Sequence, residues 1–337
     1  MRALVLNGDT YAVEDRPTPE PDTGEVLFRT HYSGICGTDL HAPNLDFYTY
    51  GVVIGHEFAG EVAALGTGVR DWKVGDRAIV HPRGNFCGVC YECRQGWPNI
   101  CSADEICAPA GSVRDGGMAA YVSLPVGKLR ALPDEVTMLE GAWAEPISIA
   151  LRGVSRSGFS VGQRTVVIGA GPIGLLTTML LRHGGASDIT VIEPSQMRRD
   201  KALELGADRA INPFDDDPAM VFGTDLDLAD CVFECSGART ALDTAVSIAR
   251  PHGVIMLVGV ASGNVNFLSL RALTKEITIR SSSRNADEIV TATRLLARKA
   301  LDVHALTSDV VSIEDSLAAL QRLDRGEGIK ILVKPTE

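Results

Sequence analysis

The sequence predicts an α/β protein with two domains, an antiparallel β-barrel and a doubly wound parallel sheet. The first observation behind this prediction is length, because 337 residues exceed what one hydrophobic core usually serves. The second is a series of short β-like runs separated by frequent turns within residues 1–122, which is typical of antiparallel sheets. The third is a regular alternation of strand and helix patterns after Gly162, which favours a parallel sheet with crossover helices.

Composition and charge argue against several classes of function. The net charge of −11 and the isoelectric point of about 5.2 argue against a protein that binds nucleic-acid backbones. No run approaches the ~20 apolar residues of a membrane span, and the first nine residues resemble a strand rather than a signal peptide. We therefore expect a cytoplasmic protein that acts on small molecules, with no nucleic-acid or membrane partner.

The first part of the chain contains the runs expected for a barrel. Short strands are predicted at residues 26–32, 58–63, 77–80 and 116–122, with glycine-marked turns between them. Residues 136–150 have helical spacing, and residues 329–333 are predicted to form a closing strand.

A thiol and an imidazole in this part of the chain predict a catalytic metal centre. Cysteine and histidine together suit zinc, and a catalytic zinc needs three protein ligands and an open position. Cys36 and His56 are two candidates, and Glu145 is predicted to be the third. A glutamate in the apolar segment 139–151 is costly unless it is ligated or paired. The alternative to ligation is a salt bridge between Glu145 and Arg152.

Three further side chains near these ligands predict the chemistry around the metal. Thr38 follows the ligand thiol by two residues, so its hydroxyl could pass a proton towards the cofactor's ribose and His41. Asp39 is predicted to accept the far N–H of His56, which would fix the tautomer of that ligand. The alternatives are a capping threonine, a surface histidine and an ordinary surface carboxylate.

A second metal site is predicted by a dense group of cysteines. Four thiols within fifteen residues can surround one tetrahedral Zn²⁺ and close its coordination sphere, which marks a structural site. These ligands are Cys87, Cys90, Cys93 and Cys101. The alternative is a chance cluster of reduced thiols. The cysteines outside every pattern are predicted to be small buried apolar side chains: Cys107, Cys231 and Cys235.

A glycine turn between a strand and a helix predicts a dinucleotide site. Residues 165–168 resemble a buried parallel strand, and an apolar helix follows at 175–182. The turn between them holds the predicted cofactor contacts Gly169, Gly171, Pro172, Ile173 and Gly174. Close glycine backbone and a helix N-terminus together bind a pyrophosphate. The alternative is a glycine turn with no ligand.

The residue after the next strand indicates which dinucleotide is bound. Glu193 follows the strand at 189–192, where a carboxylate can accept hydrogen bonds from the ribose hydroxyls and would repel a 2′-phosphate. NAD is therefore favoured over NADP. Arg198 and Arg199 oppose this preference, since a guanidinium could bind a phosphate.

The remaining elements complete a doubly wound sheet of about six strands. Further strands are predicted at 230–234, 254–259 and 277–279, with helices at 201–205, 241–249, 286–299 and 313–323. The barrel domain is predicted to comprise residues 1–152 and 290–337, and the cofactor domain residues 153–289.

These motifs together resemble the zinc-containing medium-chain alcohol dehydrogenases over essentially the whole chain. The residues that carry the resemblance are Cys36-Gly-Thr38-Asp39, Gly55-His56-Glu57, the four-cysteine cluster and the glycine turn. The resemblance implies a Rossmann cofactor domain and a GroES-like catalytic domain with a structural zinc lobe. The Glu145-Pro146 pair resembles the sorbitol, glucose and related polyol branch. Arg152 stands where that branch often has histidine, a departure that bears on the substrate pocket.

The same resemblance implies roles for residues that the patterns alone do not assign. Thr38 and His41 occupy the positions of the family's proton relay, and Glu57 that of a carboxylate which can coordinate the zinc transiently. The nicotinamide contacts are expected from Val258, Val260 and Ser282. The family forms homodimers and homotetramers, often by joining sheets of the cofactor domain.

The sequence therefore predicts a zinc- and NAD-dependent oxidoreductase that converts a polyol, sugar or cyclitol-like secondary alcohol to a ketone. The zinc would act as a Lewis acid on the hydroxyl, and NAD would accept the hydride. Two alternatives are an NADPH-dependent alcohol or aldehyde reductase and a non-catalytic nucleotide-binding protein of the same fold.

Overall fold

A computed structural model describes residues 1–222, 227–261 and 263–336, and it divides the chain into two compact units. The first comprises Met1–Glu145 and Ile289–Glu337, and the second Pro146–Glu288. Residues 146–152, predicted to be part of the barrel domain, belong to the second unit. They lie within the helix α5 (Ala144–Ser157), which begins at the division.

The first unit is built on a sheet of seven strands with the order β14-β15-β3-β4-β5-β7, in which β6 also pairs with β3. Its strands are β3 (Glu25–Gly34), β4 (Glu57–Leu65), β5 (Arg77–Val80), β6 (Tyr121–Pro125), β7 (Leu129–Ala131), β14 (Thr307–Ser312) and β15 (Lys330–Lys334). A separate hairpin pairs β1 (Arg2–Asn7) with β2 (Thr10–Asp15). All pairs are antiparallel except β14 with β15.

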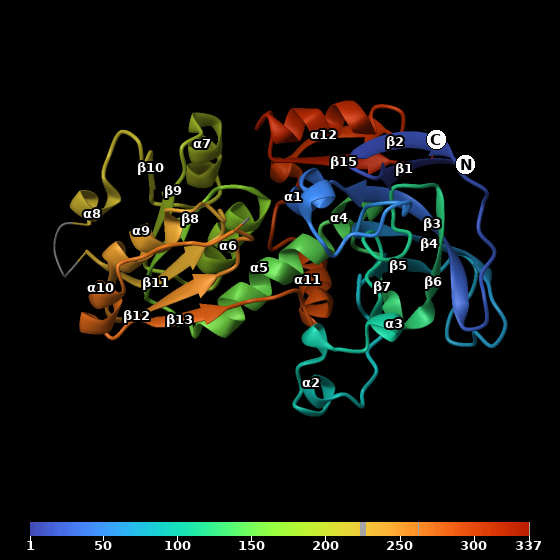
Figure 1. Ribbon diagram of the computed structural model, residues 1–337, viewed down its shortest axis with the longest axis horizontal. Coiled ribbons are helices and arrows are strands. Elements are labelled where there is room, and N and C mark those ends of the chain that lie inside the picture. The colour runs from blue at the N-terminus through green and yellow to red at the C-terminus, as the bar shows by residue number, and fades with distance from the viewer. Residues whose placement is uncertain (223–226, 262, 337) are drawn as a thin grey trace. The chain divides into compact units, whose positions relative to one another are not determined.

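Short helices connect these strands. They are α1 (Gly37–Leu40), α2 (Tyr91–Arg94), α3 (Asp104–Cys107), α4 (Met138–Gly141), α11 (Glu288–Ala297) and α12 (Ser316–Asp324), with 3₁₀ turns η1 (Ala42–Asn44), η2 (Pro98–Ile100), η3 (Val126–Lys128) and η4 (His304–Leu306). Helix α12 packs against β15 and β2, as Figure 1 shows. Among the described residues, one apolar core of this unit lies around Leu4, Ile54 and Ile331, and another lies around Phe28 and Phe58.

The helix predicted over residues 136–150 is wrong as a single element, because α4 and α5 are separate. Helix α4 begins at a capping box, in which Thr137 and Glu140 each accept a hydrogen bond from the other's backbone amide. It ends at Gly141, a residue that weakens helices. A new helix starts at Ala144, immediately after the fully buried Trp143.

The second unit is a parallel sheet of six strands with the order β10-β9-β8-β11-β12-β13. This is the doubly wound order, so the predicted fold class is confirmed. The strands are β8 (Arg164–Ile168), β9 (Asp188–Ile192), β10 (Arg209–Ile211), β11 (Ala229–Glu234), β12 (Ala249–Leu257) and β13 (Thr278–Ser281). Its helices are α6 (Pro172–His183), α7 (Gln196–Glu204), α8 (Pro218–Val221), α9 (Ala241–Ile248) and α10 (Ser269–Thr274).

The strand that precedes the glycine turn lies at the centre of this sheet. Val166, Val167 and Ile168 of β8 are all buried, as expected for a parallel strand covered on both faces. Helices α6, α7 and α9 pack against β8, β10 and β11 respectively (Figure 1). Among the described residues, no helix is both long and apolar enough to cross a membrane.

Candidate active site

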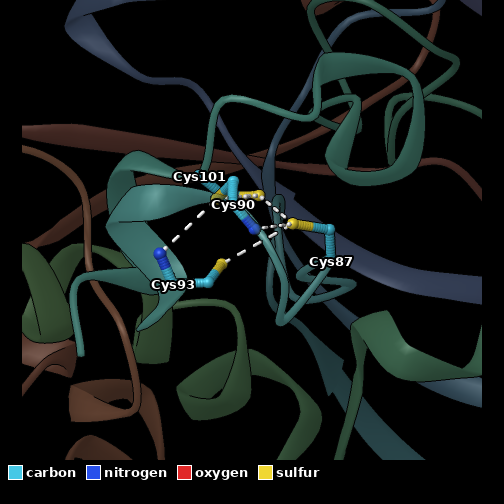
Figure 2. A group of neighbouring side chains, drawn as sticks. All are labelled: Cys87, Cys90, Cys93 and Cys101. Atoms are coloured by element: carbon cyan, nitrogen blue, oxygen red, sulfur yellow. Dashed lines mark hydrogen bonds between the residues drawn. The ribbon is translucent and has the colours of Figure 1, made fainter. Parts of the chain in front are cut away.

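The structure brings the four clustered cysteines together in one lobe of the first unit. Figure 2 shows the sulfurs of Cys87, Cys90, Cys93 and Cys101 gathered around a common centre, and all four ligand atoms lie within 4.8 Å of one another. The sulfur of Cys101 is 3.5 Å from that of Cys87 and 3.8 Å from that of Cys90. The sulfurs of Cys87 and Cys93 are 3.9 Å apart.

These distances fit a tetrahedral zinc. Zn–S bonds of ~2.3 Å give a tetrahedron with edges of about 3.8 Å, close to the observed separations. The backbone amides of Cys90 and Val89 point at the sulfur of Cys87, at 3.3 and 3.4 Å, and lower the pKa of that thiol. The amides around Cys87 therefore favour the thiolate that zinc requires of this ligand.

The other three cysteines lie in different surroundings. Cys107 is fully buried, but its sulfur is 2.7 Å from the guanidinium of Arg83, so it is more than an apolar side chain. The same guanidinium donates to the carbonyl of Cys101, which ties the end of the lobe to its start. Cys231 is buried in β11, and Cys235 is only partly buried.

Two of the three predicted catalytic ligands, Cys36 and His56, lie together where β3 ends and β4 begins. Cys36 caps the N-terminus of α1, and Glu57 is the first residue of β4. The ligand atoms of Cys36, His56 and Glu57 all lie within 4.8 Å of one another. This group includes the second carboxylate considered for the metal, Glu57. A thiolate, an imidazole and a carboxylate are together a donor set that fits zinc.

Glu145 is half-buried near this group, and it is not one of the residues whose ligand atoms lie within 4.8 Å of one another. Desolvation raises the pKa of its carboxyl to about 7, although the positive charge of His56 acts in the opposite direction. Its charge also interacts with those of Glu57 and Lys330. Arg152, the alternative partner considered for Glu145, forms an ion pair of 2.6 Å with Glu288. Glu145 as the third ligand remains a prediction.

Asp39 organises the surroundings of the two ligands. Its side chain is fully buried, and its Oδ2 accepts a hydrogen bond of 2.9 Å from the backbone amide of Cys36. Its Oδ1 lies 3.4 Å from Nδ1 of His56 and accepts a 2.9 Å hydrogen bond from the hydroxyl of Tyr48. This geometry is what the predicted orienting role requires.

The charges around His56 determine its protonation in the metal-free site. Burial alone would lower the pKa of His56, but the negative charges of Asp39 and Cys36 outweigh it and raise the pKa well above its usual value. A bound cation would replace that proton, since only neutral imidazole is a ligand.

The predicted relay residues lie on α1 and just after it. Thr38 is half-buried, and its Oγ1 lies 3.3 Å from the hydroxyl of Tyr48. Its position next to Asp39 and two residues from Cys36 fits a proton-transfer role. His41 is the C-cap residue directly after α1 and is exposed, as required of a group that exchanges protons with water. Both roles remain predictions.

Sequence reasoning missed Tyr48 and Lys330. Tyr48 is buried, and burial together with the charges of Asp39 and Cys36 raises the pKa of its hydroxyl, so it stays protonated as a donor. Lys330 is buried on β15, and its Nζ lies 2.5 Å from Oε2 of Glu57. The one available signal for Lys330 was a charged residue inside an apolar closing strand.

The glycine turn of the second unit has the form that a pyrophosphate site needs. Gly169 has φ of +95°, and a Cβ there would lie 2.8 Å from Cβ of Ser236. A Cβ at Gly174 would lie 1.8 Å from the carbonyl of Gly169, so only glycine permits this approach of helix to strand. By contrast, a Cβ at Gly171 would meet nothing within 4 Å. This open space at the start of α6, before Pro172 and Ile173, fits a phosphate group.

Glu193 lies beside this turn, directly after β9. Its carboxylate is buried and accepts hydrogen bonds from the amides of Ala170 at 2.7 Å and Ser195 at 2.9 Å. Arg199 donates to the carbonyls of Glu193 and Pro194, which engages its guanidinium within its own loop. Arg198 is half-buried on α7. The ribose contact of Glu193 remains a prediction.

The residues predicted to contact nicotinamide follow β12 and β13. Val258 is half-buried, whereas Val260 is 66% exposed. The hydroxyl of Ser282 is buried and has no hydrogen-bond partner in the described chain. A buried polar atom without a partner suits a site that a polar ligand completes. Sequence reasoning missed Glu234, a buried carboxylate at the end of β11.

Comparison with known proteins places this geometry in a family. An alcohol dehydrogenase GroES-like domain matches residues 22–134, and a zinc-binding dehydrogenase domain matches residues 172–298. Sorbitol dehydrogenase from Gallus gallus is 33% identical, over 100% of this chain and 97% of its own. The chain belongs to the zinc-containing medium-chain alcohol and polyol dehydrogenases.

Two further relatives agree with this family. A probable D-xylulose reductase from Aspergillus clavatus is 32% identical, over 98% of this chain and 96% of its own. The crystal structure of a zinc-binding dehydrogenase from Sinorhizobium meliloti, bound to NADP, superposes with a TM-score of 0.92. It is 28% identical and covers 99% of both chains. The protein is therefore an oxidoreductase that acts on CH–OH groups of small molecules, with zinc and a nicotinamide dinucleotide as cofactors.

Proposed function

We propose that this protein oxidises a secondary alcohol of a polyol, sugar or cyclitol-like substrate to a ketone, with NAD as the hydride acceptor. The alcohol carbon gives up a hydride and its hydroxyl gives up a proton, so that NAD⁺ and alcohol become NADH, ketone and H⁺. The observation that carries the proposal is the group of Cys36, His56 and Glu57, supported by the buried Asp39. The names of the sorbitol dehydrogenase and xylulose reductase relatives support a polyol as substrate.

The residues of the first unit have distinct roles in this proposal. Cys36 and His56 would hold the zinc with a carboxylate from Glu57 or Glu145, and bound zinc supplies a Lewis acid while NAD supplies the hydride acceptor. Asp39 keeps the imidazole of His56 in the tautomer that can ligate. In the proposed relay the hydroxyl of Thr38 accepts the proton of the alcohol while it gives up its own proton, and His41 releases a proton to solvent.

Two variants separate the candidate carboxylates. Glu57→Gln and Glu145→Gln each keep the size of the side chain but remove its charge. The variant that lacks the true third ligand should hold fewer than two zincs per chain, because only the zinc of the cysteine lobe is retained in full. The other variant should retain two zincs per chain. Metal analysis of the purified proteins reads this directly.

The preference for NAD rests on Glu193. A buried carboxylate beside the glycine turn would repel the 2′-phosphate of NADP, and Arg199 is engaged in its own loop. The NADP-bound relative makes the competing NADPH-dependent reduction worth testing directly.

The experiment is a panel of polyols, sugars, cyclitols and simple alcohols, each offered with NAD⁺ or NADP⁺ and followed by the absorbance of the reduced cofactor. The proposal predicts the highest kcat/KM for a polyol-class substrate with NAD⁺. A preference for NADP⁺ would overturn the argument from Glu193. Full zinc content with no activity on any substrate would favour a non-catalytic protein.

We further propose that the protein is a homodimer, which could pair into a homotetramer. Strand β13 is an edge strand of the parallel sheet, and all four of its residues are exposed. Leu270 and Leu273 of α10 and Ile279 of β13 are large apolar side chains with exposed fractions of 64%, 73% and 39%. An unpaired edge with exposed apolar neighbours suits pairing with a second sheet.

Light scattering tests this oligomer. Ile279→Asp should convert dimers to monomers, whereas Val161→Asp, at an exposed valine outside β13, should leave the mass unchanged. A wild-type protein that is monomeric at micromolar concentration would contradict the proposal.

We also propose a cytoplasmic location. All eight cysteines are free thiols, and four of them are gathered as metal ligands. A reducing compartment preserves such thiols. Fractionation of the source cells tests this, and recovery in an extracellular fraction would contradict it.

A further inference from the structure

Glu234 is a buried carboxylate that binds two loops of the second unit at once. It is the last residue of β11 and is 5% exposed. Its Oε1 accepts three hydrogen bonds from the loop that follows: from the amide of Ser236 at 2.7 Å, its hydroxyl at 2.6 Å and the amide of Gly237 at 2.8 Å. Its backbone carbonyl accepts 2.8 Å hydrogen bonds from the amides of Val258 and Gly259 after β12.

The two loops pack against each other with no space for additional side chains. A Cβ at Gly259 would lie 2.4 Å from the amide nitrogen of Gly237 and 2.7 Å from Oε2 of Glu234. A Cβ at Gly237 would lie 2.3 Å from the carbonyl of Val260. The position of residues 258–260 therefore depends on where Glu234 holds residues 236 and 237.

The same loop also contacts the glycine turn. A Cβ at Gly169 would lie 2.8 Å from Cβ of Ser236, so Ser236 forms one wall of the turn. Strands β8 and β11 are neighbours at the point where the strand order reverses, which is where doubly wound sheets bind ligands. Glu193 follows β9 on one side of that point, and Glu234 ends β11 on the other.

We propose that Glu234 is a positioning residue for the nicotinamide half of the dinucleotide. Its charge is compensated by donors that all come from one loop, and this fixes that loop against residues 258–260. Without the charge, the loop would occupy other conformations in part of the molecules. The affinity for the dinucleotide would then fall in proportion to the fraction of molecules that keep the binding-competent loop. The inference rests on the proposed function, because it needs residues 258–260 to face the nicotinamide.

Two variants test the role without removing the fold. Glu234→Gln keeps the shape and removes the charge, and Ser236→Ala removes one of the three hydrogen bonds. The ligands are NADH and ADP-ribose, which lacks the nicotinamide ring. Both are titrated against the zinc-loaded protein by calorimetry, and circular dichroism with metal analysis checks that each variant is folded.

In Glu234→Gln the Kd of NADH should rise by about tenfold, since a hydrogen bond to a charged group contributes more than one to a neutral group. The Kd of ADP-ribose should rise by less than that of NADH, because ADP-ribose lacks the ring expected next to residues 258–260 and is affected only through the wall that Ser236 forms beside the glycine turn. Ser236→Ala should show the same selectivity with a smaller effect. Glu193→Gln is the matched control, and it should weaken both ligands in parallel.

The outcomes separate this inference from the proposed function. Equal losses for NADH and ADP-ribose in Glu234→Gln, or unchanged NADH binding in both variants, would overturn the role of Glu234. A wild-type protein that binds neither NADH nor NADPH would instead overturn the proposed function.

Discussion

Lys330 and Glu57 form a buried ion pair in which Nζ lies 2.5 Å from Oε2 and both side chains are only 2% exposed. The ammonium also donates to the carbonyl of Ile35 at 3.0 Å and lies over the ring of Trp143. Burial alone would lower the pKa of Lys330, but the negative charges of Glu57, Cys36 and Asp39 together outweigh it and raise the pKa, so the lysine stays charged. Since Glu57 adjoins His56, this pair connects the closing strand to the metal centre.

Replacing Lys330 by methionine should strongly destabilise the protein. Lys330→Met leaves the carboxylate of Glu57 buried without its cation, at a cost of about 3–5 kcal/mol. Thermal unfolding followed by circular dichroism measures the loss. The double variant Lys330→Met/Glu57→Gln should recover part of it, because the uncompensated charge is then gone. A double variant less stable than Lys330→Met would contradict this account of the pair.

Asp39 should control zinc affinity without being a ligand. Asp39→Asn removes the negative charge that faces His56 and should lower the affinity of the catalytic zinc by about 10–100-fold. Competition with a chelator of known affinity measures this, and zinc in the cysteine lobe serves as an internal reference. Asp46→Asn, at an exposed carboxylate of the same connecting segment, is the control and should have no effect. Unchanged zinc affinity in Asp39→Asn would show that Asp39 has no orienting role.

The cysteine lobe should depend on its metal. Cys90→Ser should remove one zinc per chain and increase hydrogen exchange across residues 84–107, because the lobe has little core of its own. Cys231→Ser, at a buried thiol of β11, should keep both zincs. Normal exchange in a Cys90→Ser protein that lacks the zinc would show that the lobe folds without it.

Lys128 closes the base of that lobe and should make stability depend on pH. Its fully buried Nζ donates to the carbonyls of Pro82 and Ala108, the residues that flank the lobe on each side. Burial and the positive charge of Arg114 lower the pKa of Lys128 to about 7, while the nearby Cys107 acts in the opposite direction. An unfolded lysine has a pKa of about 10.4.

Between these two pKa values the unfolded chain binds more protons than the folded one, so the stability contributed by Lys128 rises with pH from about 7 to about 10. The difference in Tm between wild type and Lys128→Met should therefore grow in favour of wild type as pH increases from neutral. Lys73→Met, at an exposed lysine, should give a difference that does not change with pH. If the difference in Tm between wild type and Lys128→Met also did not change with pH, that result would contradict the lowered pKa of Lys128.

Patterns that are local in the sequence predict local sites well. The spacing of Cys87, Cys90 and Cys93 places their thiols on one short loop and helix, and the structure gathers them as that spacing indicates. The same holds for Gly169 and Gly174, because the close approach they permit lies within one strand–turn–helix unit. The doubly wound sheet followed from alternation along the chain, which is again a local property.

Contacts between distant residues were not predictable in this way. Glu57 and Lys330 are 273 positions apart, and nothing in either segment indicates the other. Their meeting depends on the pairing of β15 with β3, in which Leu332 lies opposite Gly34, and of β3 with β4, in which Gly34 lies opposite Glu57. Glu234 was missed for a different reason, since a glutamate at a strand end resembles an ordinary surface residue until its burial is known.

The most direct test of the account is a comparison of wild type with Cys36→Ser, in which zinc per chain and NAD-dependent oxidation of the best polyol are measured on the same samples. We predict two zincs and clear activity for wild type. For Cys36→Ser we predict one zinc, retained in the cysteine lobe, and a loss of more than about a hundredfold in kcat/KM. A Cys36→Ser protein that keeps two zincs and oxidises the polyol at the wild-type rate would contradict the proposed metal centre.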